Sequence, residues 1–345
     1  MGALDTIHVG IVGTGYAAKL RAEAFQADER SRVDRVAGHS PDKTAAFAQA
    51  YGAAHTLDWQ ELVARPDLDL VVICNVNQAH GVIARAALQA GKHVVVEYPL
   101  ALDPQEAAEL IALAHQQDRL LHVEHIELLG GVHQALLQNL PRIGEPVYAR
   151  YSTLNPQRPA PDRWTYQPKL FGFPLVGALS RVHRLTHAFG RVETVTCQAS
   201  FDSGAIANSS GSYRSCLCSA QLRFESGLIG EIVYGKGEAL WQVERRFEVQ
   251  GRAGALLFDG NDGTLIQAEG FQALEVGGRR GLFAKDTAAV LDHLLDGRSL
   301  YVSPAESLYA LCVADAARRS AEEGRLVKVA AEYAALASAF GAQIP

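Results

Sequence analysis

Tyr98 is the residue whose type and place in this sequence suggest chemistry most directly. It follows the apolar run Val94-Val95-Val96 and stands between Glu97 and Pro99, so a buried strand ends in two polar side chains and a proline. A lysine here would suggest alcohol oxidation, whereas a tyrosine can stay neutral, donate one hydrogen bond and pack its ring on a flat ligand. Tyr98 is therefore a candidate catalytic and substrate-binding residue. The alternative is a half-buried aromatic side chain at a strand end.

Arg181 and Arg184 are the candidates for binding negative charge. They fall within a helix predicted over residues 175–189, and on a helical wheel both lie away from its apolar stripe. A guanidinium fork can bind both oxygens of a carboxylate, and its N–H groups can supply or relay a proton. A solvated helix face with ordinary ion pairs explains either arginine equally well.

A glycine-rich turn follows the first predicted strand, residues 7–12. Gly13 permits a tight turn, Gly15 lets the backbone approach a pyrophosphate, and the small Ala18 allows close packing of helix on strand. The N–H groups at the start of the next helix can then receive phosphates. Glycines also mark ordinary turns, but this position in a first strand–turn–helix unit predicts dinucleotide binding. The residues predicted to bind the cofactor here are Gly13, Thr14, Gly15, Tyr16, Ala17 and Ala18.

The end of the second predicted strand, residues 33–37, indicates which dinucleotide is bound. An enzyme that prefers NAD usually places an acidic side chain here for the ribose 2′-hydroxyl. This chain instead has His39 and Ser40, followed by Lys43, all of which can donate to a 2′-phosphate. Ser40 also suits the cap of the helix that begins at Pro41. We predict that all three bind the cofactor and that NADPH is favoured over NADH.

Polar residues follow the next strands as well. Strand ends of a parallel sheet face the ligand crevice, so we expect cofactor contacts from Asn75, Asn77, His80 and Glu97.

The segment after residue 120 ends in a polar cluster. His125 and Glu127 are candidate substrate-binding residues, and hydrogen bonding between two domains is the alternative for both. With Glu124 they could also be taken for metal ligands, but no open coordination site can be inferred, and we predict no metal.

Two kinds of element must position these residues. The first third alternates strands and helices, which predicts a doubly wound parallel sheet of the Rossmann type in residues 1–125. From about residue 144 alternating runs predict a large, mostly antiparallel open sheet, with helices, in an α+β substrate domain over residues 126–345. Further helices are predicted at 283–295 and 305–322, and the second is a candidate to pack back on the first domain.

Composition restricts the partners and the compartment. The chain has 345 residues, 48% hydrophobic and 20% charged, which suits two globular domains. A net charge of −6 argues against nucleic acid, and the absence of a long apolar run argues against a membrane. The N-terminus lacks an export pattern, and five cysteines without metal-type spacing suit a reducing cytoplasm. We expect a small-molecule partner, while the oligomeric state stays open.

Together these features resemble the glucose–fructose oxidoreductase and inositol dehydrogenase family, in which a strand ends Glu-Lys-Pro and the lysine assists proton transfer from a hydroxyl. Here Tyr98 replaces that lysine. Within the family, the chain is similar to the biliverdin reductases, above all the cyanobacterial type. This similarity rests on the segments 121–129, 148–152, 163–166, 171–175, 180–184, 234–238 and 279–283 together with Glu97-Tyr98-Pro99.

The resemblance implies NADPH-dependent reduction of biliverdin to bilirubin. Hydride would reach the central methine carbon and a proton would reach a pyrrole nitrogen, with catalytic and substrate-binding roles for Arg181 and Arg184 beside Tyr98. The alternatives are a sugar or cyclitol dehydrogenase of the same family and a non-catalytic regulator that binds NADPH or a bilin.

Overall fold

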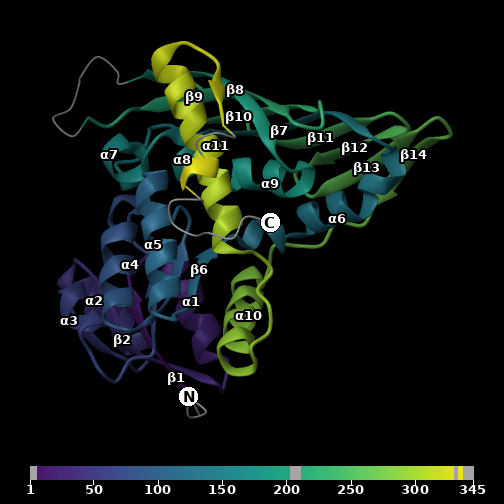
Figure 1. Cartoon of the computed structure of the whole chain (residues 1–345). Helices are drawn as coiled ribbons and strands as arrows, with labels where there is room; N and C mark the ends of the chain where they lie inside the picture. Colours follow the sequence, from purple (N-terminus) through teal and green to yellow (C-terminus); the bar gives the residue numbers. More distant parts are fainter. Residues whose placement is uncertain (1–5, 203–210, 330–332, 337–345) are drawn as a thin grey trace. The chain divides into compact units, whose positions relative to one another are not determined.

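The computed structural model describes residues 6–202, 211–329 and 333–336, which fall into two compact units (Figure 1). The first unit holds residues 6–126 and 281–308, and the second holds 127–280 and 309–336. The boundary predicted after residue 125 lies next to this division, but the predicted second domain ran unbroken to residue 345. Residues 1–5, which carry the expectation about export, lie outside the described part.

The sheet of the first unit is parallel throughout, in the order β3-β2-β1-β4-β5-β6. The predicted doubly wound arrangement is confirmed, and its winding reverses between β1 and β4, where such sheets bind ligands at the carboxyl ends of strands. The strands are β1 (Ile7–Val12), β2 (Ser31–Ala37), β3 (Ala54–Thr56), β4 (Leu70–Ile73), β5 (His93–Glu97) and β6 (Leu121–Glu124). The helices are α1 (Tyr16–Gln26), α2 (Pro41–Ala50), α3 (Trp59–Val63), α4 (His80–Gln89), α5 (Pro104–Gln116) and α10 (Leu282–Asp296), with the 3-10 turns η1 (Asn77–Ala79) and η2 (Ile126–Leu128) at strand ends.

Helix α10 belongs to the first unit although in sequence it lies between the two segments of the second unit. Val290 and Leu291 are fully buried in one cluster with Ile7 of β1 and Phe25 of α1. An apolar face of this kind must be covered, and its partner is decided by the tertiary fold rather than by neighbours in sequence.

The second unit contains a nine-stranded sheet in the order β14-β13-β12-β11-β7-β10-β9-β8-β15. Among the strand pairs of this sheet that the described residues form, only β7–β10 is parallel, so the predicted mostly antiparallel sheet is confirmed. Helices α6, α8 and α9 contact the sheet strands, and alternate residues of β9 are exposed. The strands are β7 (Pro146–Pro156), β8 (Val192–Asp202), β9 (Ser215–Phe224), β10 (Ile229–Gly237), β11 (Glu244–Gly251), β12 (Gly254–Asp259), β13 (Asp262–Gln267), β14 (Gly270–Leu274) and β15 (Val327–Lys328). The helices are α6 (Gly131–Asn139), α7 (Pro168–Phe171), α8 (Pro174–Gly177) and α9 (Ser180–Phe189), with the 3-10 turns η3 (Leu140–Ile143) and η4 (Trp164–Tyr166), while α11 (Pro304–Glu323) begins in the first unit and continues into the second.

The single helix predicted over residues 175–189 is wrong, because α8 ends at Gly177 and α9 begins at Ser180. Ala178 leaves the helical region, with φ −107° and ψ 40°. The ring of Phe171 lies where a side chain at position 177 would be, 2.5 Å from its Cβ, so the glycine allows α7 to pack against the break.

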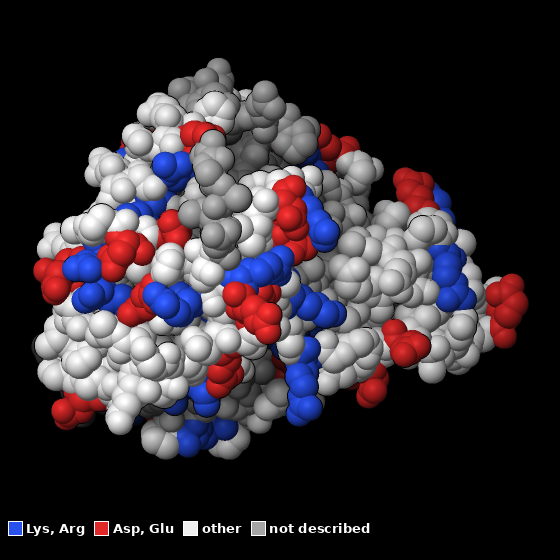
Figure 2. All heavy atoms as spheres, turned by 90° about the horizontal axis from the view of Figure 1, so that it is seen from below, with Lys and Arg blue, Asp and Glu red and all other residues white. Residues whose placement is uncertain are grey.

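Surface charge and helix composition give two further facts. On the face shown in Figure 2 acidic and basic side chains lie next to one another. No helix in the described part of the chain has both the length and the apolar character that crossing a bilayer requires.

Candidate functional site

The glycine turn between β1 and α1 has the geometry of a phosphate-binding loop. Gly13 has φ +127°, and a Cβ there would lie 2.2 Å from the carbonyl oxygen of Cys74, so only glycine fits. Among the described residues, a Cβ on Gly15 would meet no atom within 4 Å, and the start of α1 has no side-chain cap hydrogen bond. The first N–H groups of α1 are therefore not taken by a side-chain cap, which is the arrangement that receives phosphates at a helix start. Of the other predicted residues, Tyr16 is exposed, Thr14 and Ala17 are half-buried, and the buried Ala18 lies in one apolar cluster with the residues of β1.

The residues predicted to choose between the dinucleotides lie just beyond β2. His39 and Lys43 are exposed and Ser40 is half-buried. Ser40 is the N-cap residue of α2, but its side chain makes no cap hydrogen bond, while its carbonyl oxygen accepts from the hydroxyl of Thr44 at 2.6 Å. The hydroxyl of Ser40 is therefore not used by its own helix.

The polar residues after β4 differ in their surroundings. His80 is buried, with its ring nitrogens 2.8 Å from the carbonyl oxygen of Pro99 and 3.3 Å from that of Asn75, so it links the ends of β5 and β4. Burial lowers the pKa of His80 in spite of these carbonyls. Asn77 is also buried. The side-chain oxygen of Asn75 is buried and has no hydrogen-bond partner in the described part of the chain.

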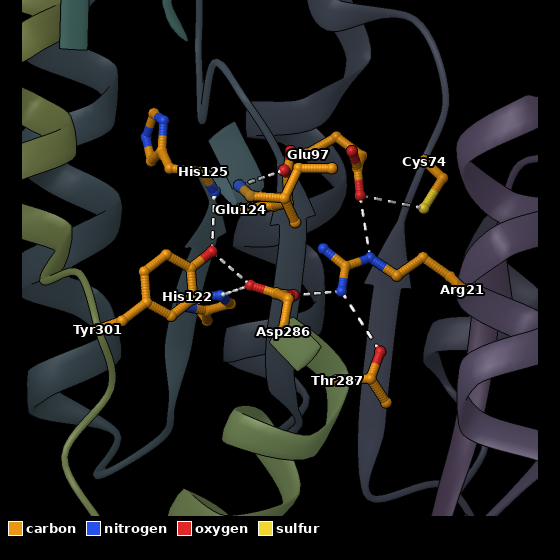
Figure 3. A network of polar contacts seen from close by, with 10 residues as sticks. Arg21, Cys74, Glu97, His122, Glu124, His125, Asp286, Thr287 and Tyr301 are labelled. Carbon is orange, nitrogen blue, oxygen red and sulfur yellow. Dashed lines mark hydrogen bonds and ion pairs between the residues drawn. The ribbon is translucent and has the colours of Figure 1, made fainter. Parts of the chain in front are cut away.

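Glu97 belongs to a buried network that the sequence did not indicate (Figure 3). Arg21 of α1 is fully buried, donates from Nε to Glu97 at 3.0 Å and pairs with Asp286 of α10. Asp286 also accepts from His122 at 2.8 Å and from Tyr301 at 2.5 Å. Burial would raise the pKa of Asp286, but the charges of Arg21 and His122 outweigh it and lower this pKa. The network ties α1, α10 and β6 to the end of β5, immediately before Tyr98.

Glu124, at the end of β6, is a buried carboxyl group close to this network. Its side chain accepts from the backbone N–H of Ile126 at 2.6 Å. Burial and the negative charge of Glu97 raise the pKa of Glu124 well above its ordinary value, and Arg21 only partly offsets them. A protonated Glu124 can stay buried beside Glu97 without adding charge.

The aromatic rings of Tyr98 and His125 lie against each other at the ends of β5 and β6. Their rings are stacked, with centroids 5.4 Å apart and planes 7° from parallel. His125 is held by Ser307 Oγ, 2.9 Å from Nε2, and its backbone N–H donates to Tyr301 at 3.2 Å. The structure thus brings two predicted substrate-binding residues together in the first unit. Tyr301, which accepts from the N–H of His125, donates to Asp286 and so links this pair to the Arg21 network.

In the second unit Glu127 and Arg184 form an ion pair, which Arg279 and Arg245 join. Arg184 is buried on α9, where the sequence left open a solvated face, and its guanidinium carbon lies 5.4 Å from the ring centroid of Tyr151. Burial would raise the pKa of Glu127, but the three arginines lower it to about 2.

Arg181, the other predicted arginine, has a separate environment. It lies over the ring of Tyr234 at 5.3 Å and donates to Ser180 Oγ at 3.0 Å. Sequence reasoning missed Arg245 and left out Arg279. The only sequence signal for Arg279 was that it forms, with Arg280, an arginine pair flanked by glycines.

In the described part of the chain no group of three or more His, Cys, Asp and Glu side chains could hold a metal ion.

Comparison with known proteins identifies the family. A model of an oxidoreductase family with an NAD-binding Rossmann fold matches residues 7–125, and a model of that family's C-terminal alpha/beta domain matches residues 139–329. A biliverdin reductase from Synechocystis sp. PCC 6803, solved with biliverdin and NADP+, is 52% identical with a TM-score of 0.89, over 92% of this chain and 99% of that chain. A levoglucosan dehydrogenase in complex with NADH, 20% identical with a TM-score of 0.81, shares the fold over 94% of this chain and 99% of that chain.

Among curated proteins, biliverdin reductase A of Mus musculus is 29% identical over 191 residues, which are 54% of this chain and 60% of that protein. The chain thus matches less than two thirds of that relative's length. The predicted family and the NAD(P) cofactor class are confirmed. The chain belongs to the oxidoreductase family that joins an NAD-binding Rossmann fold to a C-terminal alpha/beta domain, and it is an NAD(P)H-dependent oxidoreductase similar to the Synechocystis biliverdin reductase.

Proposed function

We propose that this oxidoreductase reduces biliverdin to bilirubin with NADPH, by hydride transfer to the central methine carbon and protonation of a pyrrole nitrogen. The observation that carries the proposal is the 52% identity, over 92% of the chain, to a reductase solved with biliverdin and NADP+. Tyr98 supports it, because alcohol oxidation calls for a group that takes a proton from a hydroxyl, and the lysine that does so in this family is missing here.

In the first unit the cofactor is bound by the Gly13–Ala18 turn, the polar strand ends and the residues after β2. Bound NADPH supplies the hydride. The start of α1 holds the pyrophosphate, and Asn75 offers its buried side-chain oxygen as an acceptor. The stacked rings of Tyr98 and His125 give a flat pigment an aromatic surface. Tyr98 thus orients the reactants and need not donate the proton.

In the second unit Arg184 and Arg181 bind the polar groups of the bilin. Arg184 is held by Glu127 and by the ring of Tyr151, and its Nη1 is buried with no hydrogen-bond partner in the described part of the chain. An N–H fixed in this way can donate to a carbonyl or pyrrole nitrogen of the substrate and relay the proton.

The preference for NADPH rests on His39, Ser40 and Lys43. Replacement of Lys43 by Ala is expected to raise the KM for NADPH about tenfold and to leave the KM for NADH unchanged, because only NADPH carries the 2′-phosphate. Equal effects on both cofactors would contradict the assignment.

We also propose a reducing, cytoplasmic location, since all five cysteines are free, and fractionation of the source cells tests it.

The function is tested by mixing the purified protein with biliverdin and NADPH, then with NADH, and recording the pigment and cofactor spectra. Loss of the biliverdin band with matching NADPH oxidation is expected. Binding of biliverdin without NADPH oxidation would instead identify a non-catalytic bilin-binding protein. Turnover of a sugar or cyclitol panel with no reduction of biliverdin would identify a sugar dehydrogenase.

A further inference from the structure

The cluster around Glu127 in the second unit has more positive charge than its own carboxylate can neutralise. Arg184 and Arg279 both donate to Glu127, with Arg279 Nη1 at 2.8 Å from Oε2, and Arg245 Nη2 lies 3.7 Å from the same oxygen. In the described part of the chain none of these three arginines pairs with another carboxylate. Three guanidinium groups thus face one carboxylate, a surplus of two positive charges.

The cluster of three arginines has a buried donor without a partner on Arg184 and solvent-accessible donors on Arg279 and Arg245. Arg184 is only 2% exposed, and its Nη1 has no hydrogen-bond partner in the described part of the chain. Leaving a buried charged donor unpaired is costly, so Glu127 does not fully satisfy the inner end of the cluster. The side chains of Arg279 and Arg245 are 43% and 34% exposed in the second unit. A ligand can therefore reach these two from solvent.

The three arginines stand on supported backbone. Arg184 is on α9, and Arg245 is on β11 opposite Thr153 of β7. The segment that carries Arg279 packs directly on the start of α6, where a Cβ on Gly131 would lie 1.8 Å from the carbonyl oxygen of Gly277. The arrangement is thus built into the fold of the second unit and does not depend on a free loop.

The positive charge of these arginines also acts on Tyr151 of strand β7 in the sheet. Burial would raise the pKa of the Tyr151 phenol, yet Arg184, Arg181 and Arg245 outweigh burial and lower it. An unbalanced field of this kind favours an anionic ligand, and planar guanidinium forks suit a carboxylate.

We propose that Arg279 and Arg245 form a carboxylate-binding subsite that takes a propionate arm of the substrate, with Glu127 holding the three guanidinium groups together. The proposal rests on the proposed function and extends it: Arg184 serves the tetrapyrrole core and the two outer arginines serve its carboxylate arm. Arg279 and Arg245 then determine specificity for bilins with free carboxylates.

The test compares Arg279→Ala and Arg245→Ala with Arg280→Ala, an exposed neighbour with no ion pair in the described part of the chain. Biliverdin and biliverdin dimethyl ester are each titrated into the protein without cofactor, and KM and kcat are then measured with NADPH. We expect each of the two variants to weaken biliverdin binding and raise its KM about 10- to 100-fold, because one charged hydrogen-bond partner of the carboxylate is lost. Binding of the dimethyl ester, kcat and the KM for NADPH should change less than about twofold, as should every value for Arg280→Ala.

Unchanged biliverdin affinity in both variants, or an equal loss for acid and ester, overturns the subsite. A rise in the KM for NADPH instead of biliverdin assigns these arginines to a cofactor phosphate and also overturns it. If the wild-type protein binds biliverdin in an Arg279-dependent way but does not oxidise NADPH, the proposed function fails while the subsite stands.

Discussion

Each unit contains a group of charged side chains around a buried arginine, and the two groups differ in the sign of their excess charge. In the first unit one arginine, Arg21, faces three carboxyl groups, those of Glu97, Asp286 and Glu124. In the second unit one carboxylate, Glu127, faces three arginines. The first group can reduce its excess by protonation of Glu124, whose pKa burial and Glu97 raise, whereas the arginines of the second group keep their positive charges in the resting protein. We infer from this difference that the first group supports the fold, and that the second binds an anionic ligand, as proposed above.

Arg21→Ala tests the supporting group and has the largest expected effect. It leaves Asp286 and Glu97 as buried carboxylates without their cation, so the free energy of unfolding should fall by about 3–5 kcal/mol. Denaturant unfolding measures this loss. Lys19→Ala, on an exposed position of the same helix, is the control and should change stability by less than about 0.5 kcal/mol. A small loss for Arg21→Ala would mean that the network contributes little to the fold.

Arg184→Ala tests the ligand-binding group. Removal of its buried donor should lower kcat/KM for biliverdin about 100-fold, or roughly 3 kcal/mol, since a hydrogen bond from a charged donor is lost. Steady-state kinetics measure the effect, and circular dichroism checks that the variant is folded. Turnover equal to that of Arg280→Ala would remove Arg184 from the site.

Glu127→Gln tests how the contribution of the second group to stability depends on pH. The folded pKa of Glu127 is lowered to about 2, so its contribution to stability is present above its ordinary pKa near 4.5 and is lost as pH falls toward 2. The contribution is about 2 kcal/mol once screening at the partly exposed arginines is allowed for. Wild type should therefore lose its advantage over Glu127→Gln between pH 4.5 and 2 in urea unfolding. A constant difference between the two proteins would contradict the ion-pair account.

For Glu124→Gln, the stability difference from wild type is expected to change with pH in the opposite direction. The folded pKa of Glu124 is raised, so wild type loses stability as pH rises from about 4.5 through the folded pKa. Glutamine keeps an acceptor for the N–H of Ile126 and cannot ionise. The variant should gain on wild type by up to about 1.4 kcal/mol per pH unit in that window. A stability difference that stays constant with pH would mean that the pKa of Glu124 is not raised, and a gain of wild type as pH rises would mean that it is lowered.

Tyr98→Phe has the smallest expected effect. The stacking on His125 is kept and only the hydroxyl is lost, so kcat should fall less than about tenfold, equivalent to 1.4 kcal/mol. Rapid-mixing kinetics with biliverdin measure it. A loss of a thousandfold or more would make Tyr98 the proton donor and take that role from Arg184.

The features predicted from sequence are those whose signal is local. The turn at Gly13, the strand end at Tyr98 and the two sheet types each follow from neighbouring residues, and the structure confirms the fold class. The two charged groups join residues that are far apart in sequence, such as Arg21 with Asp286, 265 positions away. Arg21 resembles any helix arginine until α10 covers it, and Arg245 resembles any strand arginine until Glu127 lies beside it.

The central claim is that hydride reaches a conjugated carbon and not a carbonyl. It is tested most directly with NADPH deuterated at C4, in separate samples for each face of the nicotinamide, and biliverdin as acceptor. We predict that one of the two samples gives bilirubin with a single deuterium at its central bridging carbon, located by NMR and mass spectrometry. Deuterium at another position, or oxidation of NADPH without transfer to the pigment, would contradict the account.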